Sequence, residues 1–100
     1  MKIAIFGKAF ATEFDDAVKH ILRRIEEIDP NPLVEAAFMR MLDDRMNVSD
    51  QLRSFEEHHE LKGCDFLVAI GGDGTVLEAA TWARESEIPV LAVNTGRLGF

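Results

Sequence analysis

The strongest constraint on the fold is an apolar run that leads directly into a glycine-rich turn. Residues Phe66–Ile70 are all apolar, and Gly71–Thr75 follow at once with the sequence GGDGT. A short apolar run bounded by turn residues is typical of a strand buried on both faces of a parallel sheet. Parallel α/β sheets bind ligands outside the carboxyl ends of their strands, which is where Asp73 falls. This stretch therefore predicts both a fold class and the place of a site.

The remaining segments predict an α/β domain in which strands and helices alternate. Apolar residues recur with helical spacing over residues 13–28, and Asp29–Pro32 ends that helix. The expected strands are Lys2–Phe6, Leu33–Ala36, Asp65–Ile70 and Val90–Val93. The other expected helices are one that continues from the second strand to Met46 and one over Val76–Glu85. We therefore predict a small three-layer Rossmann-like domain, with a mainly parallel sheet of about four strands and helices on both faces.

Two helix starts and one polar segment complete this prediction. Thr12 is expected to cap the first helix, and Thr75 with Glu78 forms a capping box for the last one. The segment Gln51–Leu61 is highly polar, so we expect at most a short helix there.

Length and composition limit the classes of protein that this sequence can represent. A chain of 100 residues suits one domain, and a net charge of −7 argues against non-specific binding to nucleic acid or to an anionic membrane. Cys64 is the single cysteine, which excludes an intrachain disulfide and indicates a reducing compartment. The apolar stretch at the N-terminus is too short for a signal peptide or a membrane span. We expect a cytoplasmic protein.

The glycine turn does not match two familiar phosphate-binding motifs. A P-loop requires a lysine after its last glycine, but Gly74 is followed by Thr75. A dinucleotide fingerprint requires a small residue where Leu77 stands. Amides at the start of a helix favour an anion, whereas Asp73 would repel it unless the carboxylate meets a hydroxyl or a metal ion. This combination indicates phosphoryl transfer. The alternative is a tight turn in which Asp73 bonds only to nearby amides.

Two segments together resemble the N-terminal domain of the NAD kinases. These are Gly71–Leu77, with the sequence GGDGTVL, and Ile88–Phe100, which ends in N-x-G-x-L-G-F. The motif GGDGT is shared with lipid kinases of the diacylglycerol and sphingosine types, and GGDG is shared with phosphofructokinases. The Asn94–Phe100 segment, at this distance from the glycine turn, is what singles out the NAD kinases.

The resemblance implies a role for each site residue. Asp73 corresponds to the aspartate that accepts the proton of the adenosine ribose 2′-hydroxyl of NAD. The residues of the turn that would line the nucleotide pocket are Gly72, Gly74 and Thr75. The residues of the second segment that would lie beside NAD are Asn94 and Phe100. The implied phosphoryl donor is ATP or polyphosphate, the implied cofactor is a divalent metal such as Mg²⁺, and the product is NADP. No residue of this chain is expected as a metal ligand.

The family's Asn-Glu motif and second glycine-rich motif belong to a following domain, which this sequence lacks. We therefore expect residues 1–100 to be an N-terminal domain that has little or no activity alone. A sheet cut before its partner domain should expose apolar surface, so we also expect self-association into a homo-oligomer. The alternatives are another GGDG-type kinase, acting on a lipid or a sugar phosphate, and a non-catalytic nucleotide-binding α/β module.

Overall fold

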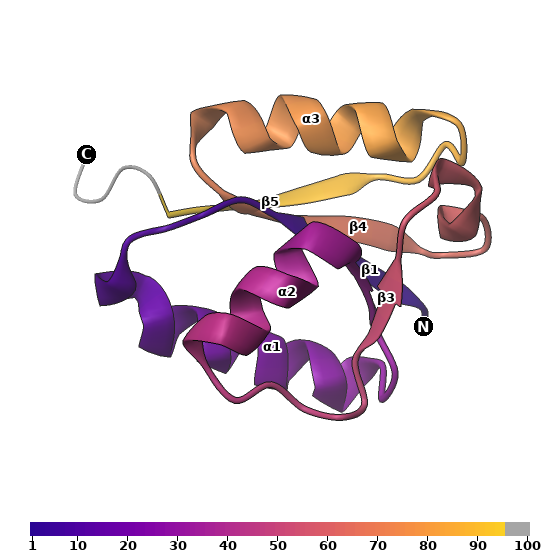
Figure 1. Cartoon of the computed structure of the whole chain (residues 1–100). Coiled ribbons are helices and arrows are strands. Elements are labelled where there is room, and N and C mark those ends of the chain that lie inside the picture. The colour runs from indigo at the N-terminus through magenta and orange to yellow at the C-terminus, as the bar shows by residue number, and fades with distance from the viewer. Residues whose placement is uncertain (96–100) are drawn as a thin grey trace.

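Five parallel strands form one sheet at the centre of the protein (Figure 1). The computed structural model describes residues 1–95. The strands are β1 (Ile3–Gly7), β2 (Leu33–Glu35), β3 (Arg53–Phe55), β4 (Phe66–Gly71) and β5 (Val90–Asn94). Their order across the sheet is β3-β2-β1-β4-β5, and every neighbouring pair is parallel.

Helices cover both faces of the sheet. Helices α1 (Asp15–Ile28) and α2 (Ala36–Arg45) lie on one face, and α3 (Asp73–Arg84) lies on the other (Figure 1). Two short 3₁₀ turns, Thr12–Phe14 and His58–Leu61, precede α1 and β4. The apolar side chains of β1 and β4 alternate between two cores: Ile3, Ile5, Val68 and Ile70 pack with α1 and α2, whereas Ala4, Phe6, Leu67 and Ala69 pack with α3. The predicted three-layer α/β fold is therefore confirmed.

The strand count differs from the prediction because β3 lies in the polar segment where we expected at most a short helix. Of its residues, only Phe55 is buried, while Arg53 and Ser54 are exposed. This strand is an edge strand that pairs only with β2, so it needs one inward side chain rather than an apolar run. The segment carries no alternating pattern long enough to reveal such a strand.

Both predicted threonine caps are wrong. Thr12 lies in the 3₁₀ turn, and α1 begins at Asp15 after Phe14, whose side chain makes no capping bond. Thr75 is the third residue of α3, which begins earlier than predicted, directly after Gly72. Of the three α-helices in residues 1–95, α2 has a side-chain cap, Glu35, whose carboxylate accepts hydrogen bonds from the amides of Ala37 and Phe38 at 3.0 and 3.1 Å.

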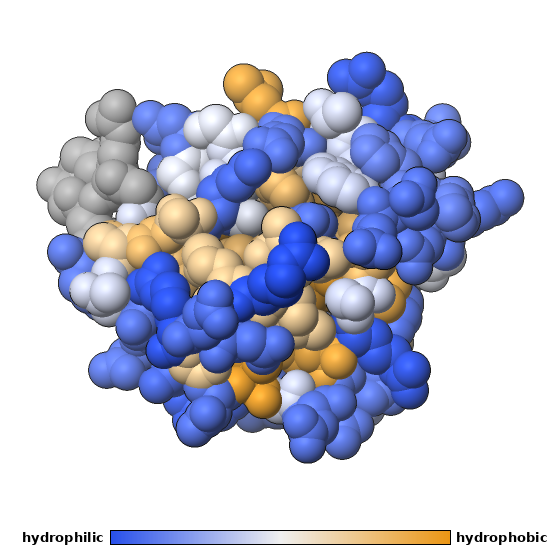
Figure 2. Space-filling view, viewed as in Figure 1, coloured by the Kyte–Doolittle hydropathy of each residue, from blue (hydrophilic) through white to orange (hydrophobic). Residues whose placement is uncertain are grey.

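Apolar side chains also reach the surface. Leu77 on α3 and Leu91 on the edge strand β5 are 76% and 53% exposed. Figure 2 shows apolar atoms at the surface between the two helical layers. The exposed apolar edge that the sequence predicted is thus present at β5. Within residues 1–95, none of the helices has both the length and the apolar character that a membrane span requires.

Candidate functional site

The two central strands create a crevice at their carboxyl ends. β1 continues into the chain that forms α1 on one face, whereas β4 continues into α3 on the opposite face. In a doubly wound sheet, such a reversal of direction between neighbouring strands opens the crevice in which ligands bind. Gly7, the last residue of β1, pairs with Ile70, the residue before the end of β4. The glycine turn therefore lies at the one place in this topology that favours a ligand.

Asp73 is the first residue of α3 and is exposed at this crevice. The helix starts with Gly72 as its N-cap, without a side-chain capping bond, and the amide of Thr75 donates to the carbonyl of Gly72 at 3.1 Å. The position of Asp73 places a carboxylate beside the partial positive charge of a helix N-terminus. This arrangement presents a carboxylate at the crevice.

The predicted partner of Thr75, Glu78, points elsewhere. Its carboxylate lies 3.1 Å from the ammonium nitrogen of Lys8, the residue that follows β1. The amide of Lys8 donates to the carbonyl of Ile70 at 3.1 Å. Lys8 thus ties the start of α3 to the end of β1.

The glycines of the turn have different surroundings. A Cβ atom on Gly71 would lie 2.4 Å from the hydroxyl oxygen of Thr75, which is buried and packs against the turn. Gly71 also has a φ of +156°. A Cβ atom on Gly74, in contrast, would meet no described atom within 4 Å. Gly71 is therefore required by packing inside the chain, whereas Gly74 leaves open space that a ligand can enter.

The end of β5 lies beside the glycine turn. Asn94 pairs with Gly71 in the ladder, and the amide of Thr95 donates to the carbonyl of Gly71 at 2.9 Å. Asn94 is exposed at this edge. Asn94 and the turn, which are separated in the sequence, thus share one edge of the sheet. The predicted residue Phe100 lies outside the described residues.

A hollow of about 390 Å³ opens next to Gly72, and its main wall was not predicted from the sequence. That wall is the segment that follows β1, which we name the β1 wall: residues 9–14. Gly72 and Thr95 complete the lining, and the contributing members of the wall are Ala9, Phe10, Ala11, Glu13 and Phe14. The lining is mostly aromatic rings and methyl groups, with one carboxylate. Only the topology reveals this wall, because its sequence contains no binding motif.

A metal site built from this chain alone is absent from the described part of the structure. Residues 1–95 contain no group of three or more His, Cys, Asp or Glu side chains that is suited to a metal ion. The neighbouring residues His58 and His59 form no such group. The ring of His58 instead stacks on the ring of Trp82, with the two ring centres 4.3 Å apart. Mg²⁺ is commonly held by one or two carboxylates together with substrate phosphates. A single exposed carboxylate such as Asp73 fits that mode of binding.

Comparison with known proteins links this chain to one family. The family model described as the ATP-NAD kinase N-terminal domain matches residues 7–100. NAD kinases of Bacteroides fragilis and Flavobacterium johnsoniae are 37% and 35% identical to the whole chain. The chain spans 34% of the length of each of these relatives.

The fold also matches a solved structure. Yeast NADH kinase, solved in complex with NADH, superposes on the whole chain with a TM-score of 0.73 and 24% sequence identity. The match covers 31% of the yeast chain. At this level of identity, the superposition establishes the shared fold.

Proposed function

Because the chain belongs to the ATP-NAD kinase N-terminal domain family, we propose that it is the N-terminal part of an enzyme that phosphorylates NAD to NADP. The phosphoryl acceptor in this proposal is the 2′-hydroxyl of the adenosine ribose, and the donor is ATP or polyphosphate. The observation that carries the proposal is the placement of Asp73, an exposed carboxylate at a helix N-terminus in the crevice between β1 and β4.

Asp73 is proposed to orient the ribose hydroxyl and to accept its proton. When ATP is the donor, a bond forms between the ribose oxygen and the γ-phosphorus of ATP. The bond between that phosphorus and the β-phosphate oxygen of the leaving ADP breaks. The proton of the hydroxyl passes to the carboxylate. An ionised aspartate is a weak base, so most of its contribution comes from positioning the acceptor and less from proton transfer.

The other predicted residues supply contacts to the nucleotides. Gly72 and Gly74 allow the backbone to approach a phosphate or a ribose, and the open space at Gly74 supports this role. Asn94 is proposed to lie beside NAD, as is Phe100. Thr75 is buried, so its contribution is to hold the turn through its packing against Gly71.

A divalent cation, Mg²⁺ in the proposal, would be held chiefly by the substrate phosphates, and Asp73 is the carboxylate that this chain could add. When bound, it would neutralise charge that develops on the transferred phosphoryl group.

Activity should require more than these residues, because the chain spans only about a third of its relatives' length. We propose that a C-terminal domain supplies the rest of the nucleotide cleft and that the complete enzyme works in the cytoplasm. The exposed residues Leu77 and Leu91 support the proposal that the isolated chain self-associates into a homo-oligomer.

The experiment compares NADP formation by this chain alone and by the full-length protein, with ATP or polyphosphate and Mg²⁺ present. We expect rapid NADP formation by the full-length protein and little or none by residues 1–100. Near-normal turnover by the chain alone would contradict the requirement for a second domain.

A substrate competition separates the alternative kinases. NAD should be phosphorylated in preference to diacylglycerol, and the reverse preference would favour the lipid-kinase alternative. Tight nucleotide binding without phosphorylation of either substrate would favour the non-catalytic module.

A further inference from the structure

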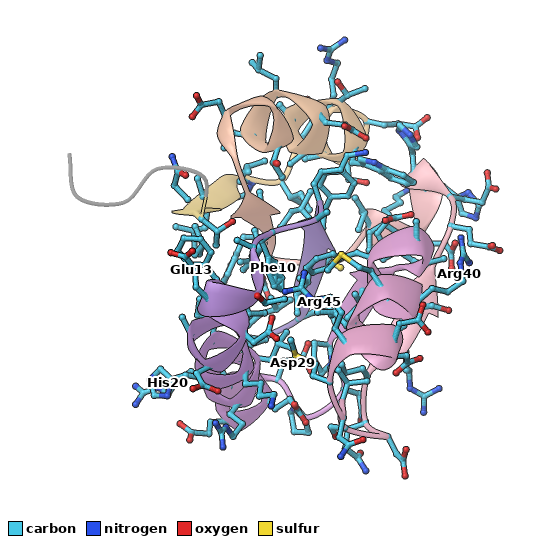
Figure 3. The ribbon with its side chains drawn as sticks, turned by 60° about the vertical axis from the view of Figure 1, so that its left-hand side comes forward. Phe10, Glu13, His20, Asp29, Arg40 and Arg45 are labelled. Atoms are coloured by element: carbon cyan, nitrogen blue, oxygen red, sulfur yellow. The ribbon has the colours of Figure 1, made fainter. Side chains whose placement is uncertain are left out.

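The last residue of α2, Arg45, reaches across to the β1 wall. Its Nη1 donates a hydrogen bond to the carbonyl of Phe10, and its Nη2 donates to the carboxylate of Asp15. The guanidinium carbon also lies 4.2 Å from the centre of the Phe10 ring. Figure 3 shows Arg45 beside Phe10, between the two helices of this layer, whereas Arg40 of the same helix points away from them. One side chain thus contacts the second residue of the β1 wall and the residue that directly follows the wall.

The contacts of Arg45 are strengthened by partial burial and by the dipoles of two helices. The Arg45 and Asp15 side chains are only 20% and 27% exposed, so water screens their attraction less than at the open surface. Asp15 is the first residue of α1 and Arg45 is the last residue of α2, so each charge also complements a helix dipole. The planar fork of Arg45 presents two nitrogens to the two acceptors in a fixed geometry, whereas a lysine has a single ammonium nitrogen on a flexible stem.

The third nitrogen of the Arg45 guanidinium shows which acceptors the side chain is oriented for. Within the described residues, its Nε is buried and has no acceptor. An unsatisfied buried donor lowers the stability of a protein. The side chain is therefore oriented for the Phe10 carbonyl and Asp15 at the expense of its own third donor.

The β1 wall needs such support because much of it is exposed. Ala9, Ala11 and Glu13 are exposed, while Phe10 is buried. The ring of Phe10 packs edge-on against the ring of Phe38, with the two ring centres 6.4 Å apart. Phe10 is thus the anchor from which the exposed residues extend toward the hollow beside Gly72. Fixing the Phe10 carbonyl and Asp15 fixes the conformation of the chain between them.

We propose that Arg45 is a positioning residue, which holds the β1 wall in the conformation that binds an uncharged part of a nucleotide. The inference rests on the proposed function. Rings, methyl groups and the carboxylate of Glu13 suit a base or a ribose, because phosphate would be repelled by that carboxylate. Arg45 itself does not touch the nucleotide and acts through Phe10 and Asp15.

The test uses the full-length protein with Arg45→Lys, Arg45→Met and Asp15→Asn. The matched control is Arg40→Met, which removes an exposed arginine from the same helix. For each variant, kcat and the KM for NAD and for ATP are measured, together with the thermal midpoint. Calorimetric Kd values for NAD and ATP provide a readout that does not depend on catalysis. Asp15→Asn and Arg45→Lys keep the experiment decisive if Arg45→Met fails to fold.

We expect Arg45→Lys to raise the KM and the Kd for one of the two nucleotides by about tenfold. The kcat should stay within about twofold of the wild-type value, because the β1 wall contributes equally to binding in the ground state and in the transition state. Asp15→Asn should act in the same direction, and Arg40→Met should change nothing. Unchanged KM and Kd in folded variants would overturn the inference, as would a loss of activity that only follows a lowered thermal midpoint.

The two proposals can fail separately. If the wild-type protein forms no NADP but its nucleotide Kd still depends on Arg45, the proposed function fails and the positioning role stands. If the wild-type protein forms NADP and the Arg45 variants match it, the positioning role fails alone. If the wild-type protein binds neither nucleotide, the positioning role fails as well.

Discussion

The two ends of the sheet use the same kind of residue for opposite purposes. At the amino end, the carboxylate of Asp29 is 5% exposed and accepts hydrogen bonds from the amides of Ile3 and Asn31 at 2.8 and 3.1 Å. At the carboxyl end, Asp73 is exposed at the start of α3. The difference teaches that a carboxylate enclosed by amides of its own chain serves the fold, whereas one that opens onto a crevice is available for chemistry.

Further contacts close the amino end. Asp65 accepts a hydrogen bond from the amide of Lys2 at 2.7 Å, and the ammonium group of Lys2 donates to the carbonyl of Asn31 at 2.7 Å. At the carboxyl end, a hollow lies beside Gly72. If the proposed function is right, the contacts at the amino end serve stability and the residues at the carboxyl end serve catalysis, and substitutions at each end should separate the two.

The largest effect is expected for Asp73→Asn in the full-length protein. This change should lower kcat by at least about a hundredfold, because the amide neither positions the ribose hydroxyl as a carboxylate does nor accepts its proton. The free energy of unfolding should change by less than about 1 kcal/mol, since Asp73 is exposed and the interaction of an exposed carboxylate with a helix dipole is small. NADP formation and chemical denaturation measure the two quantities, and an unchanged kcat would count against the proposed role.

Asp29→Ala should show the opposite behaviour. Loss of the carboxylate leaves the amide of Ile3 buried without its acceptor, so the free energy of unfolding should fall by about 2–3 kcal/mol. The kcat of the folded fraction should stay within about twofold of wild type, because Asp29 is at the far end of the sheet. Asp16→Ala, an exposed aspartate on α1, serves as the control. A kinetic defect at full folding would break the division between the two ends.

Gly71→Ala and Gly74→Ala sharpen the comparison within the carboxyl end. An added methyl at Gly71 collides with Thr75, so Gly71→Ala should destabilise the protein by about 2 kcal/mol. Gly74→Ala should stabilise α3 by about 0.5 kcal/mol, since alanine has the higher helix propensity. The same Gly74→Ala change should lower kcat/KM, because its methyl group enters space reserved for the nucleotide. Equal thermal shifts for the two variants would refute this assignment.

The smallest effect on stability is expected for Cys64→Ala. Cys64 is a buried residue at the amino end of the sheet. Burial raises the pKa of the Cys64 thiol; Lys2 opposes this, while Asp29 and Asp65 add to it. A folded-state pKa above that of the unfolded chain gives stability that is present at neutral pH and is lost as the pH rises through the folded-state pKa. Wild type should therefore lose more stability than Cys64→Ala as the pH rises into the alkaline range, as denaturation at several pH values can measure. Parallel pH curves for the two proteins would argue against this burial effect.

The sequence predicted those parts of the fold that depend on local patterns. The apolar runs gave β1 and β4, and the helical spacing gave α1, because burial on one or both faces leaves a periodic trace. The glycine turn was placed correctly at the carboxyl edge for the same reason. The strand β3 was missed, because an edge strand with one buried residue, Phe55, leaves no such trace.

The β1 wall was missed for a different reason. Its shape depends on the pair between Arg45 and Asp15, which are 30 residues apart in the sequence. The capping prediction at Thr75 failed similarly, because packing against Gly71 and the ion pair between Lys8 and Glu78 override the local motif. Site features that depend on contacts between distant segments cannot be obtained from local spacing alone.

The parallel pairing of β1 with β4 also determines when this protein can fold during its synthesis. The start of β1 is held by a residue 63 positions further along the chain, through the bond between Lys2 and Asp65. Because β1 leaves the ribosome before β4, it must wait for most of the domain before this central neighbour is available. Pairings between such distant segments form slowly, because the intervening chain must first be ordered. Until then β1 can pair along one edge with β2, while its other edge lacks a partner strand in the nascent chain.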